Sequence, residues 1–176
     1  MNSRVHHILT DPWPQIGPQQ PNPALVRALF PSYAGARGEL TATAGYFYNS
    51  LLTRDRGLSE LFACVSRDEM RHLEKLGELI LQFGGDPRLL SYGAGGRPLW
   101  WSSGALPYPR EIPVMLRRAI DSERQAIAEY RRLSAHMDGA PRALIERIIR
   151  DEEHHIELFQ RAQNTAPQPE NFRGRA

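Results

Sequence analysis

Cysteine is almost missing from this chain of 176 residues, in which Cys64 is the only one. One cysteine can form neither an intramolecular disulfide nor the paired CxxC knuckles of a zinc ribbon or a rubredoxin-type iron site. Long apolar runs are missing as well, since no stretch approaches the roughly 18 residues of a transmembrane helix. The first fifteen residues, MNSRVHHILTDPWPQ, hold no apolar signal-peptide core. We therefore expect a cytoplasmic protein with no membrane partner.

The chain also has little excess of charge of one sign. The formal net charge is +2, and the 22 basic residues are 21 arginines and Lys75. The arginines are spread along the chain and interspersed with Glu and Asp, so no basic block of the kind that binds nucleic acid stands out. We expect no nucleic-acid partner, and most charged positions are typical of solvated helix faces.

Proline is concentrated near the N-terminus, where six of the fourteen prolines fall within residues 1–31. This pattern predicts a Pro-rich extended arm over residues 1–21. Asn22-Pro23 is typical of a helix N-cap followed by proline at the first helical position. Pro31 is expected to end or kink that short helix.

Four longer segments have the composition and apolar periodicity of helices. Apolar residues recur at i, i+3, i+4 and i+7 in the second and the fourth, and no segment shows convincing strand alternation. The predicted helices cover residues 32–53, 57–83, 110–137 and 141–163. A Pro-, Gln- and Asn-rich tail, residues 164–176, is expected to be disordered.

The connections between these helices predict their arrangement. Short links join the first helix to the second and the third to the fourth, so each pair should form an antiparallel hairpin. Residues 84–109 form one long connection, rich in Gly, Pro and aromatic residues. A connection of that length can cross from one end of a helical bundle to the other. The sequence therefore predicts an all-α, antiparallel four-helix bundle over residues 22–163 with one long crossover.

An octet occurs twice in the chain, as RDEMRHLE at 67–74 and RDEEHHIE at 150–157. It belongs to a larger repeat. Glu39 precedes Tyr46 by seven residues, and Glu123 precedes Tyr130 by seven residues. The separations from Glu39 to Glu69 and from Glu123 to Glu152 are 30 and 29 residues. Duplication of a helical hairpin explains such a repeat but does not explain why its polar residues persist.

Metal chemistry explains their presence. Glu and His three residues apart on a helix point about 60° from each other, so both can address one point beside the helix. Buried carboxylates are costly unless they are neutralised, and two divalent cations would balance four of them. Two Glu-x2-His motifs with one more Glu from each remaining helix form the ligand set of di-iron and di-manganese carboxylate bundles. The predicted ligands are Glu39, Glu69, His72, Glu123, Glu152 and His155.

A plainer interpretation applies to isolated matches. One Glu-x2-His in a helix rich in Arg and Glu is usually part of a solvated face. Six further charged residues of these segments are interpreted as such surface charges: Glu60, Arg71, Glu74, Glu78, Glu146 and Glu157. The two motifs, the matched spacing and the crossover together favour the dimetal interpretation.

These motifs resemble the ferritin-like superfamily. The segments PNPALVRALFPSYAGARGELTATAGYFYNSLL, RDEMRHLEKLGELILQFGGDPR and LIERIIRDEEHHIELF are similar to small bacterial ferritin-like proteins related to manganese catalases and rubrerythrins. The resemblance covers about residues 22–163. It implies that Glu39 and His72 serve one metal ion and that Glu123 and His155 serve the other. It also implies that the two remaining ligands, Glu69 and Glu152, bridge the ions.

The resemblance implies partners for the ligands as well. Asp68 would accept a hydrogen bond from His155, and Asp151 would accept one from His72, which would fix the tautomers of the imidazoles. Tyr46 and Tyr130 would line the site or bond a terminal carboxylate. Ordinary aromatic core packing explains these two tyrosines equally well.

Departures from related families narrow the expectation. Rubrerythrins carry a second glutamate one turn after the ligand of the third helix, where this chain has Ala126, and Cys64 stands alone. The C-terminal tail cannot readily form the fifth helix of cage ferritins. No heme is expected, because Met70 and Met137 are better explained as packing residues.

The function implied by the resemblance is a dinuclear manganese or iron oxidoreductase that acts on peroxide or O₂, in a catalase-like or peroxidase-like manner. A ferroxidase or iron-binding protein and a structural, coat-like protein are the alternatives. A set of nitrogen and oxygen ligands accepts both metals. The sequence identifies no electron donor. The crossover aromatics Trp100, Trp101 and Tyr108 either cap the bundle or contact a second copy, so a homo-oligomer is left open.

Overall fold

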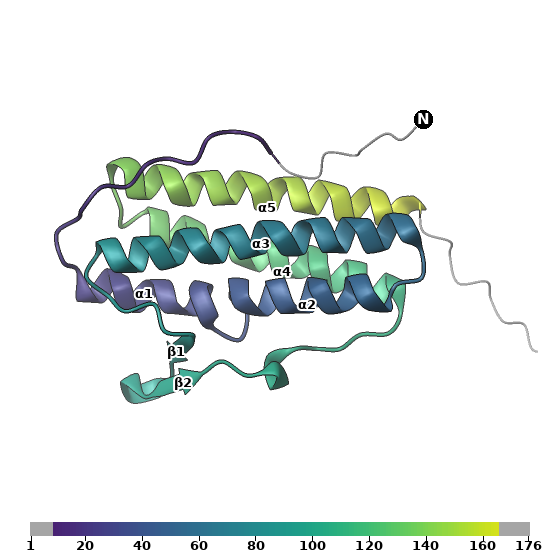
Figure 1. Cartoon of the computed structure of the whole chain (residues 1–176), viewed down its shortest axis with the longest axis horizontal. Coiled ribbons are helices and arrows are strands. Elements are labelled where there is room, and N and C mark those ends of the chain that lie inside the picture. The colour runs from purple at the N-terminus through teal and green to yellow at the C-terminus, as the bar shows by residue number, and fades with distance from the viewer. Residues whose placement is uncertain (1–8, 166–176) are drawn as a thin grey trace, which may run out of the picture.

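The computed structural model describes residues 9–165, and Figure 1 shows that its long helices lie side by side in one bundle. The helices are α1 (Pro23–Ala34), α2 (Glu39–Leu52), α3 (Arg56–Gln82), α4 (Ile112–Ser134) and α5 (Gly139–Thr165). α2 pairs with α3, and α4 pairs with α5. α1 and α2 lie end to end, so that together they form the first of four helical rods (Figure 1).

The helix starts follow from local capping. The side chain of Asn22 accepts a hydrogen bond from the Leu25 amide at 3.0 Å, and Pro23 occupies the first turn of α1. The side chain of Asp55 accepts a hydrogen bond from the Leu58 amide at 2.8 Å and starts α3 in the same way.

The first predicted helix, 32–53, is wrong in its N-terminal part. Pro31 lies inside α1, which continues to Ala34, and the break falls at residues 35–38. The chain turns there because two glycines permit close backbone approach. A Cβ on Gly35 would lie 2.3 Å from the Pro31 carbonyl oxygen, and one on Gly38 would lie 2.5 Å from the Ser32 carbonyl oxygen. The break places Glu39 in the first turn of α2.

The crossover contains a small hairpin, although no segment of the sequence shows convincing strand alternation. β1 (Leu90–Tyr92) pairs antiparallel with β2 (Pro98–Trp100), with Ser91 opposite Leu99. Three-residue strands are too short for alternation of apolar and polar residues to be visible in a sequence. Two single-turn 3₁₀ helices, Ala94–Gly96 and Ser103–Ala105, accompany the hairpin.

The C-terminal boundary differs from the prediction by two residues. α5 continues through Thr165, so residues 164 and 165 are helical instead of disordered. The remainder of the predicted tail, residues 166–176, lies outside the described residues, as do residues 1–8 of the predicted N-terminal arm.

The described part of the arm, residues 9–21, forms neither helix nor strand. It lies along the outside of the bundle beside α5 (Figure 1). Trp13 and Ile16 pack against the hydrophobic core, and a guanidinium N–H of Arg147 in α5 donates to the Leu9 carbonyl at 3.0 Å. The described part of the arm therefore packs along one side of the helices.

The buried interior has two apolar clusters with a polar band between them. The larger cluster joins α1 to the C-terminal half of α3 and the N-terminal half of α5, and the smaller one lies at the opposite end of the bundle. The band contains buried acidic side chains and histidines of four helices. Across residues 9–165, none of the helices has the length and apolarity needed to cross a membrane.

Candidate metal centre

Helices α3 and α5 each present a glutamate and a histidine to the middle of the bundle. In α3, His72 Nδ1 lies 3.0 Å from Glu69 Oε2. In α5, His155 Nδ1 lies 3.0 Å from Glu152 Oε2. All four residues are at most 1% exposed. Since residues i and i+3 share a helix face, the repeated octet produces the same arrangement twice.

The two glutamates also reach the histidine of the other helix. Glu69 Oε1 lies 3.3 Å from His155 Nδ1, and Glu152 Oε1 lies 3.2 Å from His72 Nδ1. Neither oxygen has a hydrogen-bond partner among the described residues. A buried carboxylate oxygen without a hydrogen bond is costly. These two oxygens therefore mark a place where bound cations would be stabilised.

Glu39 of α2 and Glu123 of α4 complete the cluster. Two groups of four side chains have ligand atoms within 4.8 Å of one another: Glu39, Glu69, His72 and Glu152 form one, and Glu69, Glu123, Glu152 and His155 form the other. Glu69 and Glu152 belong to both groups. The structure thus brings together all six side chains that the sequence predicts as ligands, in a buried cluster able to hold metal.

Two tyrosines tie the outer glutamates across the bundle. The Tyr46 hydroxyl of α2 donates to Glu123 of α4, and the Tyr130 hydroxyl of α4 donates to Glu39 of α2. Both tyrosines are buried. Burial, together with the nearby charge of Glu123, raises the pKa of Tyr46 well above its ordinary value, so this phenol keeps its proton. Each outer glutamate is left with one oxygen that its tyrosine does not occupy.

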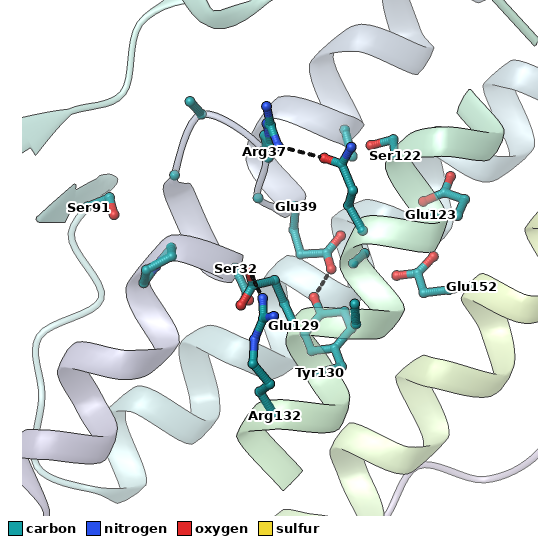
Figure 2. A pocket seen from close by; sticks show the side chains of 18 of the residues that line it. Ser32, Arg37, Glu39, Ser91, Ser122, Glu123, Glu129, Tyr130, Arg132 and Glu152 are labelled. Carbon is teal, nitrogen blue, oxygen red and sulfur yellow. Dashed lines mark hydrogen bonds and ion pairs between the residues drawn. The ribbon is translucent and has the colours of Figure 1, made fainter. Parts of the chain in front are cut away.

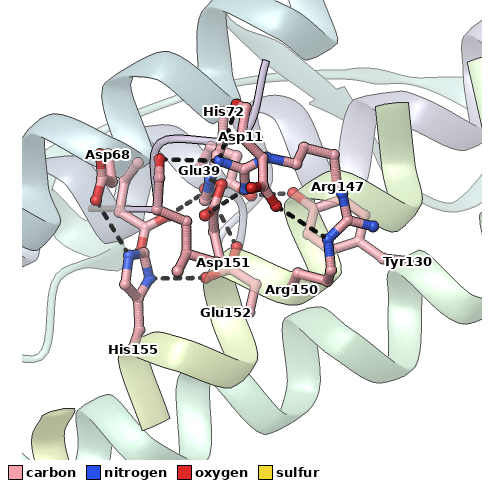
Figure 3. Close-up of polar contacts among 12 residues, drawn as sticks. Asp11, Glu39, Asp68, His72, Tyr130, Arg147, Arg150, Asp151, Glu152 and His155 are labelled. Carbon is pink, nitrogen blue, oxygen red and sulfur yellow. Dashed lines mark hydrogen bonds and ion pairs between the residues drawn. The ribbon is translucent and has the colours of Figure 1, made fainter. Parts of the chain in front are cut away.

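The two aspartates of the repeat meet the far sides of the histidine rings. His72 Nε2 lies 3.2 Å from Asp151 Oδ2, and His155 Nε2 lies 3.4 Å from Asp68 Oδ2. Figure 3 shows these contacts together with Arg147, which pairs with Asp151. An N–H donated from Nε2 leaves Nδ1 of each ring as the nitrogen directed to the glutamates.

Burial and repulsion between the carboxylates raise the pKa values of the outer glutamates and favour their protonated forms. Burial, with the negative charges of Glu69 and Glu152, raises the pKa values of Glu39 and Glu123 well above the ordinary carboxyl value. Four carboxyl groups at one buried place cannot all ionise without additional positive charge. Two bound dications would provide that charge.

The histidines respond in the opposite manner to their carboxylate neighbours. Burial alone would lower the pKa of His72, but Glu152 and Asp151 raise it well above its ordinary value. The pKa of His155 is likewise raised well above its ordinary value against the effect of burial, by its contacts with Asp68, Glu152 and Glu69. Burial likewise opposes ionisation of Glu69, but its contacts with the two histidines bring its pKa far below the ordinary value. The cluster therefore holds protons at positions that metal ions would occupy.

A cavity of about 550 Å³ connects this cluster to the surface (Figure 2). The break at residues 35–38, the strand residue Ser91 and the side of α4 form its walls, and Glu39, Glu123 and Glu152 line it from the cluster. A second cavity, of about 680 Å³, lies between α2, α4 and the end of the crossover. The site is thus reached through the face between α2 and α4.

Sequence reasoning missed two features beside the cluster: the buried Arg147, and the contact of Trp13 with His72. Arg147 is 1% exposed and lies in an apolar stretch of α5. Its only sequence signal is its place four residues before Asp151, a spacing that puts both side chains on one helix face. Trp13 contacts the His72 ring edge-to-face, with 5.9 Å between ring centroids. Its distance of 59 residues from His72 along the chain leaves no local pattern.

The chain is similar to several known proteins. The chain is 26% identical over 170 residues to a probable manganese catalase of Clostridium acetobutylicum, covering 85% of this chain and 75% of that protein. It is 31% identical over 135 residues to a 3-demethoxyubiquinol 3-hydroxylase of a Polaromonas species, covering 71% of this chain and only 60% of the relative. The crystal structure of the manganese catalase KatB from Anabaena PCC7120 superposes with a TM-score of 0.79 at 21% identity, covering 96% of this chain and 85% of that one.

The predicted fold class is confirmed by these structural neighbours. At 21% identity the likeness to KatB concerns the fold, which is an all-α bundle of the same kind. The relatives include enzymes of different activities, so they do not select one reaction. A family model described as a ferritin-like domain matches residues 38–167, which include all six clustered ligand candidates. With the repeated motif, the crossover topology and this match in agreement, the chain belongs to the ferritin-like domain family.

Proposed function

We propose that this protein is a dinuclear metal oxidoreductase that uses manganese or iron and acts on peroxide or O₂. One observation carries the proposal: Glu69 and Glu152 each lie between the two histidines, and each has a buried oxygen without a hydrogen bond from any residue of 9–165. Two such carboxylates are suited to bridge a pair of ions. The ligands proposed for one ion are Glu39 and His72, and those proposed for the other are Glu123 and His155.

The donor set supports this assignment. Four carboxylates and two imidazole nitrogens suit Mn or Fe, and no soft thiolate ligand is present in the cluster. The charge also fits, because two dications balance four carboxylates that otherwise retain protons. Each histidine has an aspartate behind its Nε2, which leaves Nδ1 available as a ligand.

The protein's own residues prepare the site for a small oxidant. Tyr46 and Tyr130 hold their protons against Glu123 and Glu39, which orients these carboxylates across the bundle. The apolar clusters on both sides keep bulk water out, and the face between α2 and α4 provides the entrance. The metal pair would supply reversible one-electron changes at two neighbouring ions, which together match a two-electron substrate.

Disproportionation or reduction of peroxide is the leading reaction, supported by the similarity to a probable manganese catalase. The test uses protein whose metal content has been determined after isolation from its native host. Loaded with that metal, it should evolve O₂ from peroxide or consume peroxide in the presence of a reductant. If neither activity is measured, peroxide is not the substrate.

Ferroxidase activity is the first alternative, supported by the similarity to a bacterial ferritin. Protein loaded anaerobically with Fe(II) should then consume O₂ in a fixed ratio to iron, with a rapid absorbance change on mixing. A structural role of the metals is the second alternative. Chelation would then lower the melting temperature strongly, while all three activity assays remain negative.

The cavity beside the cluster favours one more candidate, oxygen-dependent hydroxylation of an organic substrate. Its volume of about 550 Å³ is within the range of pockets that hold organic ligands and exceeds the need of peroxide or O₂. The hydroxylase relative supports the same class. With iron, O₂ and a reductant, an aromatic substrate should gain one oxygen atom, as measured by mass spectrometry. An unchanged substrate would exclude this candidate.

A further inference from the structure

The two halves of the centre differ at one pair of equivalent positions. Asp68 and Asp151 occupy the same place in the repeated octet, and each faces a histidine of the other helix. Four residues before Asp151 stands Arg147, whereas four residues before Asp68 stands Cys64. Within residues 9–165, Asp151 has a guanidinium partner and Asp68 has none. The near-symmetric centre is therefore asymmetric in its surroundings.

Arg147 joins the N-terminal arm to this side of the centre. Its guanidinium pairs with Asp151, and one of its N–H groups donates to the Leu9 carbonyl at 3.0 Å and to the Asp11 carbonyl at 3.5 Å. The indole of Trp13 covers the guanidinium at 4.9 Å. The side chain is 1% exposed, so its charge depends on Asp151 and on these contacts.

The same indole reaches the ligand candidate itself. Trp13 meets the His72 ring edge-to-face at 5.9 Å, and His72 Nε2 meets Asp151 at 3.2 Å. The His72 ring thus contacts Asp151 through Nε2 and also contacts the indole of Trp13. Arg147 contacts both Asp151 and Trp13. His155 has the contact with Asp68 but, among the described aromatic contacts, none with an aromatic side chain of the arm.

We propose that Arg147 is a positioning residue for one metal position only: with Trp13 it clamps the N-terminal arm onto α3 and α5 and fixes His72 through Asp151. The inference rests on the proposed dinuclear centre. The His72 position is preorganised, because the imidazole loses little freedom when an ion binds. The His155 position lacks this clamp, so loss of Arg147 leaves it unchanged.

The direction of the change in metal affinity distinguishes a positioning role of Arg147 from a purely electrostatic one. If Arg147 acted mainly as a positive charge near the ions, its removal would reduce repulsion and tighten metal binding. Its charge is paired with Asp151 at contact, so this repulsion is largely cancelled. A positioning role instead predicts weaker binding when the clamp is removed. Changes in such outer partners of metal ligands typically cost about 10–100-fold in affinity.

The test uses the full chain with Trp100 and Trp101 replaced by Phe, which leaves Trp13 as the only indole. Co(II) titrations followed by visible absorbance report all bound ions. Quenching of Trp13 emission reports the ion at the His72 position, because the indole contacts that ring. In Arg147→Met, one of two equivalents should bind about 10–100-fold more weakly, and it should be the one that quenches Trp13. Arg147→Lys, which keeps a charge near Asp151, should restore part of the affinity.

Two matched controls have no place in the clamp. Cys64→Ser changes the position of α3 that is equivalent to Arg147. Arg150→Met removes an exposed contact between α5 and the arm, in which the Arg150 and Asp11 side chains lie 3.8 Å apart. Both should bind two equivalents with wild-type affinity. Unchanged affinities in Arg147→Met, equal weakening of both equivalents, or tighter binding would each overturn the proposal.

The clamp can be tested without metal as well. In metal-free Arg147→Met, Trp13 should become accessible to acrylamide, with red-shifted emission, while helical circular dichroism is retained. A wild-type protein that binds no Co(II) would contradict the dinuclear centre, whereas an unchanged Trp13 environment in the variant would contradict the clamp. If Arg147→Met does not fold, Trp13→Leu removes the clamp without removing a charge. It should weaken one Co(II) equivalent, and two wild-type equivalents would overturn the proposal.

Discussion

At the scale of single residues, position within the bundle separates two glutamates of the same octet. Glu152 and Glu157 belong to the same octet, but Glu152 is fully buried between two histidines and Glu157 is 60% exposed beside Arg161. An exposed pair of this kind contributes little to stability. The two residues should therefore differ sharply in their effect on metal binding.

We predict that Glu152→Ala abolishes binding of a second metal equivalent and weakens the first by at least about 10–100-fold. The reason is that both proposed ions share this carboxylate. Glu157→Ala is the matched control and should bind two equivalents as the wild type does. Metal content after gel filtration and a Mn(II) titration measure both. Equal losses in the two variants would contradict the assignment of Glu152 as a shared ligand.

The pKa values of the cluster predict how pH affects the metal-free fold. The pKa values of His72 and His155 lie above 6.5, so between that value and their own the folded state binds more protons than the unfolded chain. Glu39 and Glu123 act in the same direction from about 4.5 upward. Stability is therefore fully present at low pH for these groups and is lost as pH rises through their raised pKa values. Each group contributes a slope of up to about 1.4 kcal/mol per pH unit.

Urea denaturation of chelator-treated protein should show that its stability decreases as the pH rises from 6.5 to 8.5. Glu69 and Asp151 have lowered pKa values, so their contribution is lost only when the pH falls below about 4, outside this range. Metal binding displaces protons, so the affinity for Mn(II) should rise over the same interval. Metal-free stability that increases from pH 6.5 to 8.5 would contradict these assignments.

Many of these residue positions could be predicted from the sequence, because the spacing of two residues along a helix determines whether they share a face. The i, i+3 relation of Glu69 to His72 and its repeat in α5 predicted that each of these glutamates shares a helix face with a histidine. Arg147 could not be found in this way, because its contacts with Leu9 and Trp13 come from a segment without regular structure. A buried arginine and a solvated one look identical in a sequence.

At the scale of secondary-structure elements, the break between α1 and α2 shapes the entrance to the cluster. Residues 35–38 line the cavity of Figure 2, and Glu39 follows directly in the first turn of α2. The N-terminus of a helix also favours a carboxylate electrostatically. The sequence indicated a break near Pro31 but misplaced it, because proline is a stronger local signal than a pair of glycines whose role depends on contact with the preceding turn.

We predict that Gly38→Ala destabilises the protein by about 1–3 kcal/mol, the usual cost of an overpacked site. A Cβ at this position would lie 2.5 Å from the Ser32 carbonyl oxygen and 2.6 Å from that of Pro31, so the backbone must move. Gly17→Ala is the control, since nothing lies within 4 Å of its Cβ, and it should change stability by less than about 0.5 kcal/mol. Urea denaturation of both variants measures the difference. Equal stabilities would show that the break tolerates a side chain.

The crossover marks the limit of sequence prediction at this scale. Its length correctly indicated a connection along the bundle, but its hairpin is made by main-chain pairing of two three-residue segments around the turn at Gly95 and Gly96. Such segments carry too few residues for a periodic signal. The indole of Trp101 donates to the Thr41 hydroxyl at 2.9 Å, so one of the crossover aromatics fastens this segment to α2.

At the scale of the whole molecule, the fold consists of two apolar clusters separated by a polar layer. The clusters stabilise the bundle at both ends. The layer contains four buried glutamates, two buried histidines and two buried aspartates, whose desolvation opposes folding unless their charges are balanced. A ligand that binds only the folded state adds stability that grows with the logarithm of the ratio of its free concentration to its dissociation constant. The metal ions should therefore matter more to stability here than in a bundle with an apolar centre.

We predict that Mn(II) or Fe(II) at about 100 times its dissociation constant stabilises the fold by about 2.7 kcal/mol for each ion bound. For a chain of this length, 1 kcal/mol corresponds to about 2–4 °C, so two ions should raise the melting temperature by about 11–22 °C. Scanning calorimetry with metal and with chelator measures the shift. Glu69→Gln keeps the size of the side chain and removes its charge, so the shift should largely vanish in that variant. A shift of wild-type size in Glu69→Gln would mean that the stabilising ions bind elsewhere than between α3 and α5.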